Sequence, residues 1–558
     1  MTRRPGILST FLARLLSEST IRILQFLLGA IAIVLVFWQL QFSTSAICCG
    51  DFDGYYHVKW TRTLWEGIRS GTFPPQFPWL PLTTLSPREF VDHHLLFHFM
   101  QMPFVAVADA RLGAKVATIV FASLAVLSCY WLLMYYRIRY VLVWLVALLA
   151  CSAPFLFRMN MAKAPPLAVV YLVIAIVLFF KKKYLPLLPL AAVFTWTYDL
   201  FVLLMMAAVF WVIVIAWTEH RFEWRPLVWV TLGCAIGLVV NPYFPQNFRQ
   251  LYEHVSIKLT LSGFDTKVGG EWYPYDAWEF LGNSAVAFVS MVVGYVMFEP
   301  SERRRAHYPA FFLLFATALM IMTARWRRIS EYWPPFAVMF AAFSLQPWLL
   351  GMRSYLTRLP AEVLDELRPF FDQQEAVRES NSDWREWLLT IGAAFVAIVL
   401  GVVLFFNIRS EIEEIGDSRP HDYFSAGAAW MRHNIPAGQT VFNTDWDDFP
   451  RLIYYDPTHN YISGLDPNYL FDKSQDLSRL YDRITLGTQE DPGPLIRDRF
   501  GARYVFSDND HHDFFDQAQR SGWFDIVYED TECTIMYIRD EKAGPLDNAL
   551  GPPELDIP

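Results

Sequence analysis

Long apolar runs separated by short polar segments fill most of the first 407 residues. Eleven of these runs approach the roughly 20 residues that an α-helix needs to cross the apolar core of a bilayer. A helix also satisfies its backbone hydrogen bonds within one segment, as a lipid environment requires. The pattern therefore predicts a polytopic α-helical membrane protein. We expect about 11 transmembrane helices, near residues 22–42, 113–135, 140–157, 165–180, 184–198, 200–217, 226–242, 283–299, 308–324, 332–350 and 387–407.

Composition agrees with a membrane protein and excludes an ordinary soluble enzyme of this length. The chain has 558 residues, of which 54% are hydrophobic and only 18% are charged, whereas soluble domains average about 25% charged residues. The six cysteines follow neither a metal-site spacing nor a disulfide framework. No small-residue cleavage site follows the first apolar run, so we interpret that run as a retained helix.

The charges between the apolar runs predict the orientation of the chain. Basic segments such as Lys181–Lys183 and Arg303–Arg305 fall on the same side as the N-terminus, and the positive-inside rule makes that side cytoplasmic. An odd number of spans then places the loop 43–112 and the C-terminal domain on the outer side of the membrane. The polar stretch 351–386 becomes a cytoplasmic connector.

The C-terminal part differs in charge and pattern from the rest. From residue 408 onward the chain holds 29 acidic and 13 basic residues, whereas residues 1–407 hold 26 acidic and 33 basic residues. Short strand and helix patterns alternate there, as is typical of a small α/β domain. The strands are expected at 440–443, 502–507, 523–528 and 534–538, and the helices at 426–434 and 470–485. We therefore divide the chain into a transmembrane domain (1–407), a periplasmic α/β domain (408–542) and a disordered tail (543–558).

A dense polar motif follows the first apolar run: Asp51-Phe52-Asp53-Gly54-Tyr55-Tyr56-His57. Asp51 and Asp53 are two residues apart, so an extended segment places both on one face. One interpretation is a divalent metal site, because carboxylates suit Mg²⁺ or Mn²⁺ and histidine also suits Zn²⁺. A second is that Asp53 works without metal, as the base for an acceptor hydroxyl. A third is an aspartate that caps a helix in a structural loop.

A second polar cluster, Asp92-His93-His94-Leu95-Leu96-Phe97-His98, lies in the same outer loop. His94 and His98 are four residues apart, so on a helix they share one face. This spacing suits a pair of metal ligands, and it equally suits a hydrogen-bonded pair. Asp92 is expected to support Asp53.

Three arginines, Arg325, Arg327 and Arg328, lie between the ninth and tenth predicted spans, on the outer side. Positive charge is unfavourable on that side, so we expect an anionic partner. Guanidinium groups match phosphate oxygens in forked pairs. The alternative is ion pairing with Glu331 or with the acidic C-terminal domain.

This layout resembles the GT-C superfamily of membrane glycosyltransferases, and within it the catalytic subunit of oligosaccharyltransferases. Those enzymes carry an acidic motif in the first outer loop, to which Asp51 and Asp53 correspond. A glutamate in a later outer loop corresponds to Glu271, and an arginine that contacts the lipid-linked pyrophosphate corresponds to Arg325, with Arg327 and Arg328 beside it. The outer domain opens with a Trp-Trp-Asp motif, to which Trp430 and the segment Asp445-Trp446-Asp447-Asp448 correspond.

The chemistry of the two polar clusters and the resemblance together give candidate roles for these residues. Asp51, Asp53, Asp92 and Glu271 would be catalytic; Asp53, His57 and His94 would hold any metal; and Trp446, Asp447 and Asp448 would bind the acceptor. The chain departs from the family in two places. The loop 157–164 lacks an acidic metal ligand and instead offers Arg158 and Lys163 to a phosphate, and the second tryptophan of the Trp-Trp pair is absent.

We therefore expect a glycosyltransferase that moves a sugar or oligosaccharide from a polyprenyl-phosphate or pyrophosphate carrier to a glycan or protein acceptor at the periplasmic face. Its partners would be this donor, the acceptor and membrane lipids, with no nucleic acid. A divalent metal such as Mg²⁺ or Mn²⁺ is the cofactor under consideration. One alternative is a transporter or flippase for a lipid-linked glycan, which would place charges inside the spans. Another is a non-catalytic glycan-binding membrane protein.

Overall fold

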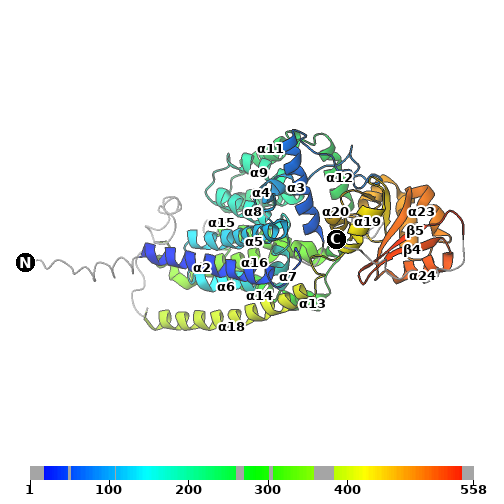
Figure 1. The fold of residues 1–558 in the computed structure, drawn as a ribbon. Helices are drawn as coiled ribbons and strands as arrows, with labels where there is room; N and C mark the ends of the chain where they lie inside the picture. The colour runs from blue at the N-terminus through cyan, green and yellow to red at the C-terminus, as the bar shows by residue number, and fades with distance from the viewer. Residues whose placement is uncertain are drawn as a thin grey trace, which may run out of the picture. The chain divides into compact units, whose positions relative to one another are not determined.

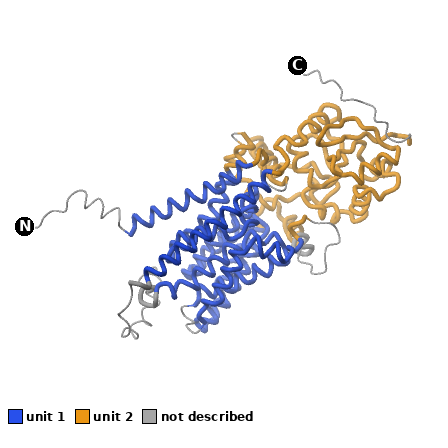
Figure 2. Tube along the Cα trace, turned by 90° about the horizontal axis from the view of Figure 1, so that it is seen from below, with its two compact units in different colours: residues 1–43, 117–238, 273–416 blue, residues 44–116, 239–272, 417–558 orange. Residues whose placement is uncertain are grey.

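The computed structural model describes residues 18–47, 52–106, 109–258, 269–300, 306–356 and 383–542. The chain divides into two compact units, which Figure 2 shows in blue and orange. Unit 1 comprises residues 1–43, 117–238 and 273–416, and unit 2 comprises residues 44–116, 239–272 and 417–558. Asp51, most of the predicted connector and the predicted disordered tail lie outside the described residues.

The described secondary structure of unit 1 consists of helices, and Figure 2 shows its long helices side by side. Within it α14 packs against α15 and α16, and α18 packs against α6. Its helices are α2 (Glu18–Gln41), α5 (Ala110–Tyr135, beginning in unit 2), α6 (Val141–Ala150), α7 (Ala153–Met159), α8 (Pro165–Phe180), α9 (Leu187–Thr197), η1 (Asp199–Phe201), α10 (Val202–Glu219), α11 (Arg225–Val239), α13 (Ala277–Asn283), α14 (Ala285–Met297), α15 (His307–Arg325), η4 (Arg327–Glu331), α16 (Trp333–Leu356) and α18 (Asp383–Gly416).

Five described helices are long and apolar enough to cross a membrane, and the number rises to seven if each of two bent pairs is one span. The five are α2, α5, η1 with α10, α15 and α18. The bent pairs are α6 with α7 and α13 with α14, each bent by 82°. Helices α8, α9 and α11 lie at three further predicted spans but have only 10–17 residues each. The helical, multi-span class is confirmed, and the count of 11 spans stays a prediction.

Helix α18 shows why lipid is the natural surrounding of unit 1. None of its most apolar 18-residue window is buried in the protein. Its exposed side chains include Trp387, Phe395, Ile398 and Phe405. A continuous apolar surface of this length is unfavourable in water, so it marks contact with lipid.

Unit 2 joins the outer loop to the C-terminal residues. It contains five strands, and Figure 1 shows part of the sheet, at β4 and β5, with helices such as α23 and α24 around it. Its elements are α3 (Asp53–Ser70), α4 (Leu95–Val105), α12 (Gln246–Lys258), η2 (Gly270–Trp272), α19 (Ser425–Asn434), β1 (Thr440–Asn443), α20 (Phe449–Tyr455), β2 (Asn460–Tyr461), α21 (Asn468–Lys473), α22 (Gln475–Thr485), α23 (Pro492–Phe500), β3 (Ala502–Asp508), α24 (His512–Ser521), β4 (Phe524–Glu529) and β5 (Cys533–Ile538).

The strands form one mixed sheet in the order β2-β1-β3-β5-β4. Strand β1 is parallel to β2 and β3, and β5 is antiparallel to β3 and β4. Phe442, Val505 and Met536 place fully buried side chains in the core of this domain. The predicted small α/β domain and its four strand segments are thus confirmed. The predicted helix 470–485 is in fact α21 and α22, because the Ser474 side chain accepts from the Leu477 amide and starts a new helix.

The outer loop between α3 and α4 is tied to the C-terminal residues by hydrogen bonds to backbone carbonyls. The Tyr461 amide in β2 donates to the Trp79 carbonyl at 2.7 Å, and the Trp79 indole donates to the Pro457 carbonyl at 2.9 Å. The Thr84 amide donates to the Tyr469 carbonyl at 3.0 Å. Because buried backbone groups require such partners, this loop is a fixed part of the domain that the C-terminal residues form.

Helix α3 sets the position of the acidic motif. It begins at Asp53, directly after Phe52, and ends where Gly71 takes a positive φ of 76° and bonds back to the last turn. Its buried side includes Tyr55, Tyr56 and Trp60. The burial of this aromatic side holds the first turn of α3, and therefore Asp53, in one place.

Candidate active site

Asp53 is the first residue of α3 and is partly buried. The helix dipole favours a carboxylate at this end. The N-cap position itself belongs to Phe52, and no side chain caps the helix there. Asp53 therefore does not fill the capping role that one interpretation of the sequence gave it. Asp51 lies outside the described residues.

Three buried side chains form a hydrogen-bonded row beside this helix. An oxygen of Asp92 lies 2.8 Å from Nδ1 of His98, and Nε2 of His98 lies 2.8 Å from Nδ1 of His57. Exposure is 1% for Asp92, 0% for His98 and 4% for His57. The row joins α4 to α3, with His57 one turn after Asp53.

Both carboxylate oxygens of Asp92 have partners. Oδ2 also accepts from the Trp60 indole at 2.9 Å, and Oδ1 accepts from the His94 amide at 2.9 Å. Burial alone would raise the pKa of Asp92, but the charge and hydrogen bond of His98 and the bond from Trp60 outweigh it and hold the pKa below its usual value. Asp92 thus stays ionised and orients His98. The ring nitrogens of His98 bond to Asp92 and His57, and not to His94 as a hydrogen-bonded pair of His94 and His98 would require.

The predicted metal set does not assemble among the described residues. Those residues contain no group of three or more His, Cys, Asp or Glu side chains that could hold a metal ion. His98 uses both ring nitrogens within the row, and His57 uses one of them on His98. The ring of His94 packs against that of His57, with centroids 5.2 Å apart. The described side chains therefore do not form a metal site.

Two residues predicted for different roles approach each other. Glu271 lies in η2, and Trp446 follows β1. Both side chains lie next to Gly269. A Cβ atom at Gly269 would lie 3.7 Å from Cγ of Glu271 and 4.0 Å from Cη2 of Trp446. The Trp446 ring is thus close to the segment that carries Glu271.

A cavity of about 500 Å³ opens at the carboxyl ends of β1 and β3. Parallel neighbouring strands end at one edge of a sheet, where α/β proteins commonly bind ligands. Here Thr444, Asp445 and Trp446 follow β1, while Asp508 ends β3 and His511 comes shortly after it. The lining residues are Thr444, Asp445, Trp446, Pro467, Tyr481, Asp482, Thr485, Leu486, Asp508, Asp510, His511, His512 and Asp513.

His511 links the acids of this cavity. Its Nδ1 bonds to Asp508, and its Nε2 lies 3.6 Å from an oxygen of Asp445. Burial would lower the pKa of His511, but the hydrogen bond and charge of Asp508 outweigh it and raise the pKa above its usual value. Sequence reasoning missed Asp508 and His511, because only the pairing of β1 with β3 brings them to Asp445.

The predicted acceptor residues separate in the structure. Trp446 lines the cavity, whereas Asp447 and Asp448 are not among its lining residues. Asp448 is only 4% exposed. Its burial, followed by the charges of Asp508 and Asp445, raises the pKa of Asp448 well above its usual value.

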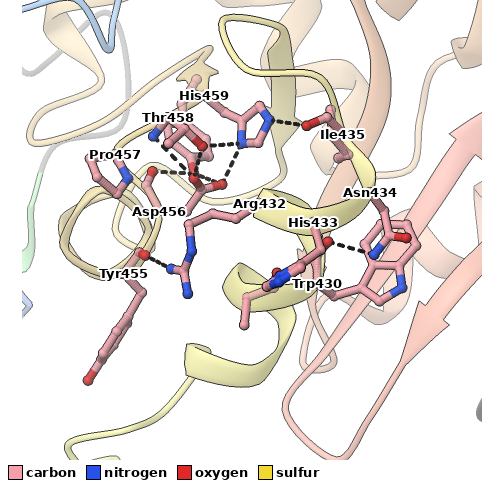
Figure 3. Close-up of polar contacts among 12 residues, drawn as sticks. Trp430, Arg432, His433, Asn434, Ile435, Tyr455, Asp456, Pro457, Thr458 and His459 are labelled. Carbon is pink, nitrogen blue, oxygen red and sulfur yellow. Dashed lines mark hydrogen bonds and ion pairs between the residues drawn. The ribbon is translucent and has the colours of Figure 1, made fainter. Parts of the chain in front are cut away.

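Trp430 lies in α19, whose last residues form a network of hydrogen bonds (Figure 3). Asn434 and His433 bond to backbone carbonyls one turn back in α19, and Arg432 donates to the carbonyl of Tyr455. His459 lies beside them and joins Asp456, at 2.6 Å, to the Ile435 carbonyl, at 3.1 Å. These bonds end α19 and hold it against the chain that leads into β2.

The predicted phosphate-binding residues belong to unit 1, whereas the acids and the cavity belong to unit 2. Arg158 forms a buried ion pair with Glu331 at 2.6 Å, with 11% and 1% of the side chains exposed. Oε1 of Glu331 is therefore engaged with Arg158. Arg328 donates to the Tyr198 hydroxyl at 2.7 Å.

The remaining cations of that set differ in their partners. Arg327 donates to the Pro274 carbonyl at 3.2 Å and lies 3.7 Å from Glu279. Arg325 ends α15, and its guanidinium lies 6.0 Å from the centre of the Trp326 ring. Within the described ranges no carboxylate pairs with Arg325, and Lys163 is buried with 8% exposed.

Comparison with solved structures places this fold. It matches the oligosaccharyltransferase of Archaeoglobus fulgidus with a TM-score of 0.56 and 12% sequence identity, over 93% of this chain and 75% of that chain. It matches ArnT of Cupriavidus metallidurans, solved with bound undecaprenyl phosphate, with a TM-score of 0.52 and 12% identity, over 93% and 99% of the two chains. It matches the arabinofuranosyltransferase AftD from Mycobacteria with a TM-score of 0.51 and 14% identity, over 93% of this chain and 40% of that chain.

No family model and no curated protein matches the sequence. The structural likenesses nevertheless confirm, at the level of the fold, the resemblance to GT-C membrane glycosyltransferases. At 12–14% identity, the likeness shows the fold alone.

Proposed function

We propose that the protein is a membrane glycosyltransferase that moves a sugar or oligosaccharide from a polyprenyl-phosphate or pyrophosphate carrier to an acceptor. The observation that carries this proposal is a fold shared over 93% of the chain with two proteins that are named as transferases. The similar structure of ArnT holds undecaprenyl phosphate, and the oligosaccharyltransferase was also solved with a tethered acceptor peptide. These ligands support a polyprenyl-linked donor and a separate acceptor.

The reaction forms a bond between an acceptor oxygen or nitrogen and the anomeric carbon of the donor sugar. The bond from that carbon to the phosphate oxygen breaks, and its electron pair stays on the phosphate. Asp53 would take the acceptor proton. Asp51 and Glu271 would assist it, and Asp92 would act through His98 and His57.

The donor phosphate would be held by unit 1. Arg325 is the first candidate because its guanidinium has an aromatic neighbour but no paired carboxylate among the described residues. Arg327, Arg328 and Lys163 would add positive charge, while Arg158 is engaged with Glu331. Stabilising the charge that develops on a leaving group is commonly the largest electrostatic contribution to such a reaction.

The acceptor would bind in the cavity at the ends of β1 and β3. The Trp446 ring offers an apolar face, and Asp445, Asp482 and Asp508 offer oxygens that accept hydrogen bonds from hydroxyl or amino groups. This combination favours a carbohydrate or amine-bearing acceptor. Asp448 is buried, so its part is to support this wall of the domain.

The proposed location is a bacterial inner membrane, with the loop 43–112 and the C-terminal domain in the periplasm. The charge pattern of the cytoplasmic loops supports this orientation. Residues 44–116 and 417–558 belong to one compact unit, which favours a common side for both segments.

A direct test uses the full chain in lipid nanodiscs with radiolabelled sugars on undecaprenyl phosphate and undecaprenyl pyrophosphate. Saccharide and peptide acceptors are supplied separately, and label transferred to each acceptor is measured. We expect transfer with one donor class and no transfer by the Asp53→Asn variant. If the wild-type protein moves no label to any acceptor or to water, the proposal is wrong.

The same preparation distinguishes the two alternatives. A flippase would change the leaflet of the labelled lipid in proteoliposomes and leave the bond to the sugar intact. A non-catalytic protein would bind the lipid or glycan at equilibrium, and neither the bond nor the leaflet would change.

A further inference from the structure

Arg451 in α20 is a charged side chain buried in unit 2, with 1% exposed. Its guanidinium donates to four backbone carbonyls in the segment just before α19. They are those of Arg419, at 3.1 Å, Pro420, at 2.6 Å, His421, at 3.5 Å, and Tyr423, at 3.4 Å. These carbonyl dipoles offset part of the large cost of burying a cation.

The same guanidinium is stacked on the beginning of α3. Its central carbon lies 4.4 Å from the centre of the Phe52 ring and 4.5 Å from that of Tyr55. A desolvated cation over an aromatic face is attracted by the quadrupole of the ring. Phe52 directly precedes Asp53, and Tyr55 follows it by two residues, so Arg451 contacts both sides of the acidic residue along the chain.

Tyr55 is held at its other end as well. Its hydroxyl donates to the His421 carbonyl at 3.2 Å and lies 3.1 Å from Nδ1 of the same histidine. Burial, with the nearby charges of Arg111 and Arg451, lowers the pKa of His421 to about 4. The imidazole is thus neutral around pH 7, and its packing on Tyr55 adds no second buried cation beside Arg451.

We propose that Arg451 is a positioning residue for Asp53: it fixes the first turn of α3 on the C-terminal domain through the rings of Phe52 and Tyr55. The assignment rests on the proposed function of Asp53 as the base. Arg451 touches no reacting atom, so its effect on transfer passes through the position of the carboxylate.

Variants separate positioning from simple stability. Phe52→Leu removes one stacked ring but leaves the four carbonyl bonds of Arg451 in place, whereas Phe52→Tyr keeps an aromatic face. Arg451→Met removes both kinds of contact. Arg432→Met is the matched control, because Arg432 is also an arginine of this domain that donates to a backbone carbonyl, that of Tyr455 (Figure 3).

We expect Phe52→Leu to lower kcat roughly 10- to 100-fold, the loss that a small misplacement of a reacting group causes, with an unchanged KM for the lipid donor and a near wild-type Tm. Phe52→Tyr should restore kcat. Arg451→Met should lower both kcat and Tm, and Arg432→Met should leave kcat unchanged. Wild-type kcat in Phe52→Leu, or an equal loss in Arg432→Met, overturns the proposal.

Amide hydrogen exchange measures how firmly the contact between Arg451 and the first turn of α3 holds that turn, without an activity assay. Exchange of the amides at residues 54–57 should accelerate in Phe52→Leu and Arg451→Met but not in Arg432→Met. Unchanged exchange in the first two variants overturns the positioning role, even if the wild-type protein transfers sugar. Absence of transfer by the wild-type protein, with accelerated exchange in those variants, contradicts only the proposed function.

Discussion

At the scale of single residues, Asp53 is a carboxylate held in a fixed position at the start of α3. The helix dipole favours its charge, and Phe52 and Tyr55 hold the turn around it through Arg451. A general base needs a proton-accepting oxygen held in a fixed position. The carboxylate of Asp53 provides the oxygen, and the contacts of Phe52 and Tyr55 fix its position.

Asp53→Asn should abolish transfer, because the amide keeps the shape of the side chain but cannot accept the acceptor proton. Expression and Tm should stay near those of the wild-type protein, since Asp53 is only partly buried and does not cap the helix. Initial rates with the labelled lipid donor measure the effect. A variant that turns over at the wild-type rate would show that this residue is structural.

The arginines of unit 1 differ in their partners: Arg158 pairs with Glu331, whereas no described carboxylate pairs with Arg325. Arg325→Ala should lower kcat/KM for the lipid donor about tenfold or more, because a charged hydrogen bond is worth about 1.5–3 kcal/mol. Arg325→Lys should recover only part of this, since an ammonium cannot form the forked contact.

Arg158→Met is the control for that experiment, because it removes a cation whose partner is the buried Glu331. It should lower Tm by leaving a buried carboxylate without its cation. An Arg325→Ala variant that loses stability while its donor kinetics are unchanged would instead assign Arg325 to structure.

At the scale of elements, α3 and α4 are joined by the row of Asp92, His98 and His57. The chain keeps polar groups in this apolar interface because each of the two Asp92 oxygens has a donor. Leaving such a group unpaired costs more than the bond itself contributes.

Asp92→Asn should destabilise the fold by about 1.5–3 kcal/mol at pH 7, since it removes a charged hydrogen-bond partner. The lowered pKa of Asp92 sets the pH dependence. Its carboxylate contributes fully above the unfolded-state pKa of about 3.9, and the contribution is lost as pH falls through the folded-state pKa. The difference in Tm between variant and wild type should therefore shrink as the pH is lowered below about 4.

Glu89→Gln is the control in the same loop. Glu89 pairs with Lys473 at 2.6 Å near the surface, where an ion pair contributes about 0–1 kcal/mol. A difference for Asp92→Asn that is as small as that for Glu89→Gln, or one that grows toward low pH, would contradict this account of the row.

At the scale of the whole molecule, the outer loop and the C-terminal residues belong to one compact unit although about 300 residues separate them in the chain. Such a unit can form only if both segments are on the same side of the membrane. Reporter fusions should therefore give a cytoplasmic signal at Lys182 and a periplasmic signal at Asp510. A cytoplasmic signal at Asp510 would contradict the proposed orientation and the odd number of spans.

The sequence by itself determined the features that depend on local pattern. Apolar runs near the length of a bilayer predict helices wherever they occur, because lipid leaves the backbone no other partner. Period-two alternation and turn residues likewise marked the strands at 440–443 and 502–507. The count of spans was harder to predict, since α6 with α7 and α13 with α14 bend sharply within one apolar run.

Only the tertiary structure decided which polar residues act together. Asp92 and His57 lie 35 residues apart, Asp445 and His511 lie 66 apart, and Phe52 and Arg451 lie 399 apart. Their contacts depend on strand pairing and helix packing, which no local period encodes. From the sequence, His57 could be a metal ligand, because an imidazole can bind a metal. Its hydrogen bond to His98 forms only when α3 and α4 pack together, so the sequence does not show it.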